Sequence, residues 1–104
     1  MDLEQLYRKW LVNWQPKHAN VNFKKNSWQE TTLLAYMNVI KNVVNDLKIE
    51  DPSIKQNLFD YSDPKKYTIA YHKIINHSNF KSLQYYPLAK KSLKRYLDFL
   101  YDLK

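Results

Sequence analysis

Glycine is absent from all 104 residues of this chain, and this absence restricts the fold more than any other feature. Average usage near 7% would supply about seven glycines to a chain of this length. Without them the chain has no glycine-rich loop to cradle phosphates, no dinucleotide-binding fingerprint and no Asn-Gly or Asp-Gly hairpin turn. A sheet-rich fold is therefore disfavoured, whereas short helices joined through Asn, Ser and Pro need no glycine.

Four stretches carry apolar residues at the i, i+3, i+4, i+7 spacing of an amphipathic helix. They cover residues 3–14, 27–47, 64–75 and 88–104. Shorter apolar groups lie between them, at 54–59 and 80–83. The pattern predicts an all-α fold, namely a compact bundle of four main helices with one or two short helical turns and no β-sheet. We expect residues 1–104 to form a single helical domain.

Several helix boundaries are visible in the sequence. Ser27 and Glu30 form an S-x-x-E capping box in front of the second helix, which is expected to be the longest. Asp63 followed by Pro64 is typical of a helix start, because Asp accepts hydrogen bonds from the free amides and Pro suits the first helical position. Pro16 is expected to end the first helix.

Basic residues are concentrated in the last part of the chain. Residues 1–60 hold eight bases and seven acids, a net charge of +1, whereas residues 61–104 hold nine bases and three acids, a net charge of +6. The preference for Lys, Asn, Tyr and Ile is typical of an AT-rich bacterial or phage genome. A lysine-covered surface alone is ordinary for such a protein and needs no ligand to explain it.

The final helix places its charges against its own dipole. Lys90, Lys91, Lys94 and Arg95 come first and the acids come last, although a helix start favours acids by roughly 0.3–1 kcal/mol each. Like charges four residues apart add a repulsion of about 0.2–0.5 kcal/mol per pair. On a helical wheel these bases lie outside an apolar half formed by Leu88, Ala89, Leu93, Tyr96, Leu97, Phe99, Leu100 and Leu103.

A bound polyanion would relieve both the repulsion and the dipole. We therefore expect nucleic acid, with DNA as the expected partner, to place phosphates on the first two turns, where helix-start amides are also free. The residues expected to bind it are Lys90, Lys91, Lys94 and Arg95, helped by Lys65, Lys66 and Lys73 and by Tyr101 on the outer arc of the helix. Because the chain has only two arginines, contacts should be mainly to the backbone, with any base preference supplied by loop residues 76–86.

Residues for catalysis are missing. With no cysteine, and with its three histidines outside metal-ligand spacing, the chain lacks the donors of a zinc site. The D-L-K sequences at 46–48 and 102–104 lack the preceding acid that a metal-dependent nuclease needs. Ser27, Ser62 and Ser92 are interpreted as caps or helix-surface residues and not as nucleophiles. We expect a protein that is not an enzyme and that uses no metal, cofactor or small-molecule substrate.

The sequence also lacks signals for a membrane. Its longest uninterrupted apolar run, residues 33–37, is far shorter than a membrane span. The first ten residues do not show the basic and then apolar layout of a signal peptide. Together with the absence of cysteine, these features predict a cytoplasmic protein.

A family resemblance is carried by four segments in order: LYRKWL, SWQETTLLAYMNVIKNVVNDL, LFDYSDPKKY and LAKKSLKRYLDFL. They resemble the small helical N-terminal domain of some bacterial restriction and antiviral defence proteins, including McrB-type systems and HNH-containing endonucleases. The helix order is also similar, more weakly, to the core-binding domain of tyrosine recombinases. No catalytic residue transfers from either family. The resemblance implies an accessory DNA-binding domain, the N-terminal part of a longer protein, that works with a catalytic or motor domain or subunit.

Two other functions fit the same sequence. Small basic four-helix proteins include bacteriocin immunity proteins, which bind a protein complex at the inner face of a membrane. Length, charge and helix number fit that class, but no motif does. A scaffold that positions a catalytic domain, with a basic face that serves only solubility, is the third alternative.

Overall fold

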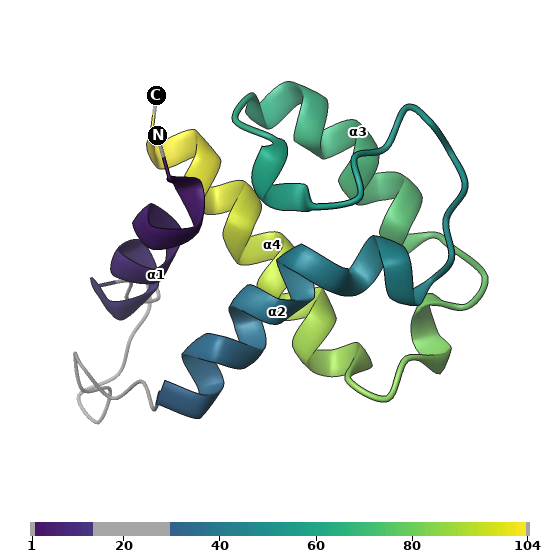
Figure 1. Cartoon of the computed structure of the whole chain (residues 1–104), viewed down its shortest axis with the longest axis horizontal. Helices are drawn as coiled ribbons and strands as arrows, with labels where there is room; N and C mark the ends of the chain where they lie inside the picture. Colours follow the sequence, from purple (N-terminus) through teal and green to yellow (C-terminus); the bar gives the residue numbers. More distant parts are fainter. Residues whose placement is uncertain (1, 14–29, 104) are drawn as a thin grey trace.

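The computed structural model describes residues 2–13 and 30–103. Its elements follow one another as α1 (Leu3–Asn13), α2 (Glu30–Asp46), η1 (Leu58–Asp60), α3 (Pro64–Ile75), η2 (Phe80–Ser82) and α4 (Tyr86–Asp102), where η marks a short 3-10 helix (Figure 1). No residue in the described stretches belongs to a strand, so the all-α prediction is confirmed. Within these stretches α2 and α4 are equally long, at 17 residues each. The capping box at Ser27 and the predicted stop at Pro16 lie outside the described residues.

Local hydrogen bonds fix the starts of two elements. The carboxylate of Asp63 accepts a hydrogen bond from the backbone amide of Lys65 at 2.9 Å, and Pro64 occupies the first position of α3. This start is the one predicted from the sequence. Asn57 caps η1 in the same way, through the amide of Phe59 at 2.9 Å. Each cap satisfies an amide that the helix itself leaves unpaired, a contribution of about 1 kcal/mol.

The end of α2 has a lysine where helices commonly have glycine. Lys48 adopts a left-handed backbone conformation with φ of 55°. The amide of Ile49 donates to the carbonyl of Val44 at 3.1 Å, and the amide of Lys48 donates to that of Asn45 at 3.0 Å. These are the two bonds of a Schellman motif, in which the left-handed position favours glycine. The side chain of Lys48 makes this conformation unfavourable by about 1–2 kcal/mol.

Helix α4 is the centre of the bundle. It crosses α2 in the middle of the molecule and also contacts α1 and α3 (Figure 1). Its buried side includes Ala89, Leu93, Leu97 and Leu100, as predicted. Leu103 was predicted on the same side but is 45% exposed, because it is the C-cap residue and lies past the last residue of the helix.

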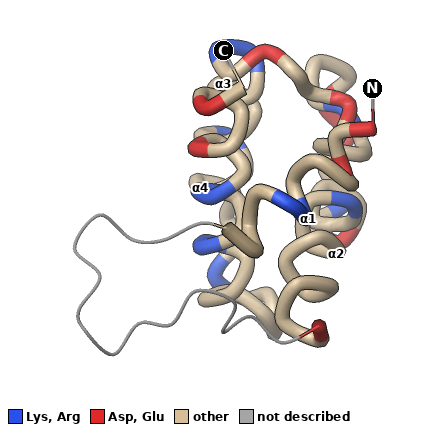
Figure 2. The backbone as a smooth tube through the Cα atoms, turned by 90° about the vertical axis from the view of Figure 1, so that its left-hand side faces the viewer, with Lys and Arg blue, Asp and Glu red and all other residues tan. Residues whose placement is uncertain are grey.

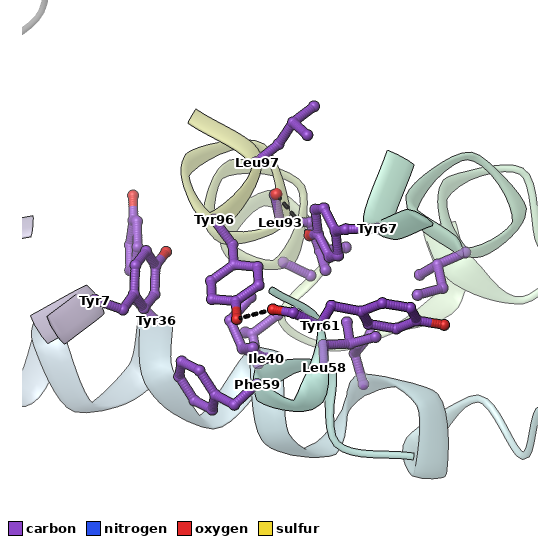
Figure 3. Packing of buried hydrophobic residues seen from close by; sticks show 14 of the residues in the cluster. Tyr7, Tyr36, Ile40, Leu58, Phe59, Tyr61, Tyr67, Leu93, Tyr96 and Leu97 are labelled. Carbon is purple, nitrogen blue, oxygen red and sulfur yellow. Dashed lines mark hydrogen bonds between the residues drawn. The ribbon is translucent and has the colours of Figure 1, made fainter. Parts of the chain in front are cut away.

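Three fully buried tyrosines, Tyr7, Tyr67 and Tyr96, form what we call the tyrosine cluster. The Tyr96 ring lies between the other two and meets both edge-on, with centroid distances of 5.2 Å to Tyr7 and 5.1 Å to Tyr67 (Figure 3). Such edge-to-face contacts suit the charge distribution of aromatic rings. Phe59 and Phe99 pack against this cluster, with ring centroids 5.4 and 5.6 Å from that of Tyr96.

Every hydroxyl of the tyrosine cluster donates to a backbone carbonyl. Two of the bonds, Tyr67 to Leu93 at 2.8 Å and Tyr96 to Tyr61 at 2.9 Å, are drawn in Figure 3. The third joins Tyr7 to Ser92 at 3.1 Å. A buried hydroxyl without a partner would cost about 1–3 kcal/mol. The three bonds therefore favour one packing arrangement of the helices over others of similar apolar contact area.

Ser92 corrects one sequence-based interpretation. It is fully buried and does not lie on the helix surface. Its hydroxyl donates to the backbone carbonyl of Tyr36 in α2 at 2.7 Å, while its own carbonyl accepts the hydrogen bond of Tyr7. A single turn of α4 is thus bonded to α1, α2 and α3, and this polar contact explains why a serine occupies the apolar side of the helix.

Candidate nucleic-acid interface

The first half of α4 carries an exposed, acid-free surface. Lys90, Lys91 and Lys94 are all exposed, and we call these three the α4 lysine surface. Figure 2 shows the basic positions of α4 grouped in the half that contains its start, with the acidic positions in the other half. Lys90 and Lys91 form no ion pair with any residue that the structure describes. The prediction that these lysines lie outside the apolar side of α4 is confirmed, and their contact with nucleic acid stays a prediction.

The backbone at the start of α4 offers fewer free amides than the sequence suggests. No side chain caps the helix, and Pro87 has no amide hydrogen to donate. The amides of Tyr86 and Ala89 already donate to carbonyls, at 3.0 and 2.8 Å. Of these first four positions, only the amide of Leu88 lacks a bond within the described chain. Phosphate binding here therefore depends on side chains, and the expectation of several free amides is corrected.

Asp98 pairs with the other two predicted bases of α4. Its carboxylate lies 3.2 Å from the Nζ of Lys94 and 2.6 Å from a guanidinium nitrogen of Arg95. The Arg95 side chain is only 28% exposed, because its position borders the apolar side of the helix. Arg95 is thus held within the fold and is a weaker candidate for phosphate binding than the sequence indicates.

Contacts made by acidic side chains within the protein also explain why α4 has acids near its end. Besides the pairs that Asp98 makes, the carboxylate of Asp102 accepts a hydrogen bond from the indole nitrogen of Trp10 in α1 at 2.7 Å. The ion pairs of Asp98 offset part of the repulsion among the bases, and the bond from Trp10 stabilises the carboxylate of Asp102 at a helix end that disfavours acids. A polyanion is therefore not required to explain the reversed charge order.

The three predicted lysines of α3 do not form one group. Lys73 is paired with Asp51 at 3.2 Å and also lies 3.2 Å from the Ser53 hydroxyl. Hydrogen bonds from Ser53 and, to a smaller extent, the contact with Lys73 lower the pKa of Asp51 to about 2. Lys66 lies on the same side of α3 as Lys73. Lys65 points about 100° away from Lys66 around the helix.

Tyr101 is exposed, as predicted, but it is far from the start of α4. Its side chain is 51% exposed. It lies eleven positions after Lys90, which corresponds to about 16 Å along the helix. It lies in the turn that contains Asp98 and Asp102. Contact with the same few phosphates as Lys90 would therefore require a ligand that follows the whole helix.

A groove that the sequence analysis did not identify lies between α2 and the start of α4. It encloses about 240 Å³, with Val39 and Leu88 among its apolar lining and Asn38 and Asn42 among its polar lining. Tyr85 also lines it and donates a hydrogen bond to Asp46. Burial and, to a smaller extent, this bond raise the pKa of the Tyr85 phenol. The sequence signal that could have indicated this groove is the pair Asn38 and Asn42, whose side-chain amides lie four residues apart on the polar side of α2.

His77 has a structural role in the loop before α4. The Nδ1 of His77 accepts a hydrogen bond from the amide of Asn79 at 3.1 Å, and this bond shapes the turn after α3. Asn79 and Gln84 are exposed. Across residues 2–13 and 30–103, no group of three or more His, Asp or Glu side chains could hold a metal ion. The helices of these stretches also include none with the length and apolar content to cross a membrane.

Comparison with protein-family models, with curated proteins and with solved structures found no match to this chain.

Proposed function

We propose that the first half of α4 binds the sugar-phosphate backbone of nucleic acid, with DNA as the expected partner. The observation that carries this proposal is the α4 lysine surface, in which Lys90 and Lys91 are exposed and unpaired among the described residues. Lysines act as point charges toward phosphates and do not select bases. The protein would thus bind nucleic acid without catalysing a reaction on it.

The cellular setting that fits this activity is bacterial restriction, antiviral defence or another DNA-processing system. The sequence resemblance supports it, as do a compact helical bundle and the exposed lysines on the first half of α4. In this proposal the chain is a non-catalytic accessory domain in the cytoplasm that works beside a catalytic or motor domain or subunit.

The affinity should depend steeply on salt. If the α4 lysine surface neutralises about three phosphates, the log–log slope of the binding constant against salt is about −3 on duplex DNA and about −2 on a single strand. If Lys65 and Lys66 also contact the ligand, the slope on duplex DNA approaches about −4.5. The slope therefore reports whether α3 takes part.

The test is fluorescence anisotropy with labelled duplex DNA, single-stranded DNA and RNA, between about 50 and 200 mM salt. We expect Lys90→Glu/Lys91→Glu to weaken binding at least about tenfold and to reduce the slope by about 2. Lys9→Glu/Lys48→Glu is the matched control, since it makes the same change in net charge at exposed positions on α1 and after α2. Equal losses for the two variants, or no loss for the first, would refute the proposal.

A further inference from the structure

A second basic surface lies between α3 and residues 53–61, and no residue of α4 lines it. It is a groove of about 300 Å³ with Ile54, Tyr61 and Ile69 among its apolar lining residues. Ile69 is 62% exposed, more than any other large apolar side chain in the described part of the chain. The groove thus presents to water an isoleucine that no element among the described residues covers.

Three lysines, Lys55, Lys66 and Lys73, surround this apolar surface, and no acidic residue lines the groove. The Nζ of Lys55 lies 5.6 Å from the centre of the Tyr61 ring, which holds this lysine at the edge of the groove. Lys66 is exposed and has no ion pair with a described residue. An occupant that matches these charges must carry acids.

The chain already shows on α3 the kind of contact that such an occupant would make. Beside the groove, the carboxylate of Asp51 pairs with Lys73, and three residues later Ile54 is buried at 5% exposure. An acidic residue followed by an isoleucine therefore packs on this side of α3 within the protein itself. The neighbouring positions, Lys66 and Ile69, repeat the combination of a lysine and an apolar side chain, and no acidic or apolar partner from the described part of the chain covers them.

We infer that this groove binds an acidic peptide segment of a partner protein, with a large apolar side chain of the peptide over Ile69 and its carboxylates on Lys55 and Lys66. A peptide matches the groove better than a nucleic acid does. Phosphates would pair with the lysines but leave Ile69 uncovered. The one aromatic ring that lines the groove belongs to Tyr61, which is 5% exposed and offers no face on which a base could stack.

The probe for the test is a labelled peptide of about ten residues in which Asp and Glu alternate with Leu and Ile. This length suffices because Lys66 and Lys73, seven positions apart, are separated by only about 10 Å along α3. The control peptide has Asn and Gln in place of the acids. Titration of each peptide into the ¹⁵N-labelled chain should shift amide resonances of residues 53–55, 61 and 66–73 with the acidic peptide only.

Ile69→Glu should weaken binding of the acidic peptide about ten- to a hundredfold, because it removes the apolar contact and adds a like charge. Leu34→Glu is the matched control, since Leu34 is 46% exposed on α2 and lies outside the groove. Lys66→Glu tests the charge contact without changing an apolar residue and should also weaken binding at least about tenfold.

Three results would overturn the inference. The first is equal binding of the two peptides, and the second is equal binding by Ile69→Glu and Leu34→Glu. The third is loss of peptide binding in Lys90→Glu/Lys91→Glu with no loss in Lys66→Glu, which would place the peptide on α4. DNA binding is measured separately with the α4 variants, so failure of one proposal leaves the other standing.

Discussion

Replacement of Lys48 by glycine should stabilise the protein, although the native chain contains no glycine. Lys48 has a φ of 55° at the end of α2, a conformation that costs a residue with a Cβ about 1–2 kcal/mol. Glycine removes this cost but increases the freedom of the unfolded chain, an opposing effect of about 0.5–1 kcal/mol. The two bonds of the Schellman motif are made by backbone atoms and remain. The expected net gain is about 0.5–1 kcal/mol.

The assay is thermal and urea unfolding followed by circular dichroism. For a domain of this size the gain corresponds to a rise in Tm of about 2–5 °C. Lys48→Ala is the control, because it removes the charge and the long side chain but keeps the Cβ. We expect its stability to stay within about 0.5 kcal/mol of the native protein.

The two variants together test whether backbone conformation is the cause. A gain in both would show that removal of a positive charge stabilises this strongly basic chain. A loss in Lys48→Gly alone would refute the left-handed assignment, since glycine at an ordinary helical or extended position destabilises the fold.

Three further outcomes follow from the structure. Burial raises the pKa values of the phenols in the tyrosine cluster. Their contribution to the free energy of unfolding is therefore complete below the ordinary pKa near 10. Above pH 10 it decreases by about 1.4 kcal/mol per phenol and pH unit. The protein should therefore unfold cooperatively within about two pH units above pH 10, with tyrosinate absorbance rising in the same transition. Tyr67→Phe removes the hydroxyl bond to Leu93 and should lower the free energy of unfolding by about 1 kcal/mol in urea titrations. Asp98→Asn removes the charged partner of Lys94 and Arg95; if α4 binds DNA, anisotropy titrations should show an affinity increase of several-fold and a steeper salt slope.

The fold was largely predictable because its signals are local. The helical spacing of apolar residues and the Asp63-Pro64 start depend on neighbours within a few positions, and they located the boundaries of α3 closely. Ser92 was misinterpreted for the opposite reason. Its hydrogen-bond partner lies in α2, 56 residues earlier in the chain, and the hydroxyl that bonds to its carbonyl lies 85 residues earlier. A single serine in a helical pattern does not reveal such partners.

The candidate site was only partly predictable. The charge order of α4 correctly indicated an exposed lysine surface, but the reversed order itself was attributed to a bound polyanion. The pairs between Asp98 and the preceding bases span three and four residues, and helical spacing alone could have indicated them. The pair between Lys73 and Asp51 spans 22 residues and crosses a loop. That contact pairs Lys73 with a carboxylate of the chain itself, and only a three-dimensional structure could reveal it.

The position of α4 gives its lysines a property that an ordinary surface helix lacks. The turn that carries Lys91 and Lys94 is also the turn whose backbone accepts the hydroxyls of Tyr7 and Tyr67. Lys90 and Lys91 are exposed and Lys94 is paired with Asp98, and the backbone beneath all three is held by the core. Nucleic acid would thus meet a preorganised row of charges, so no loss of backbone freedom would oppose binding. Bound DNA should accordingly raise Tm by mass action alone, while amide hydrogen exchange within α4 should slow only as much as the global free energy of unfolding increases.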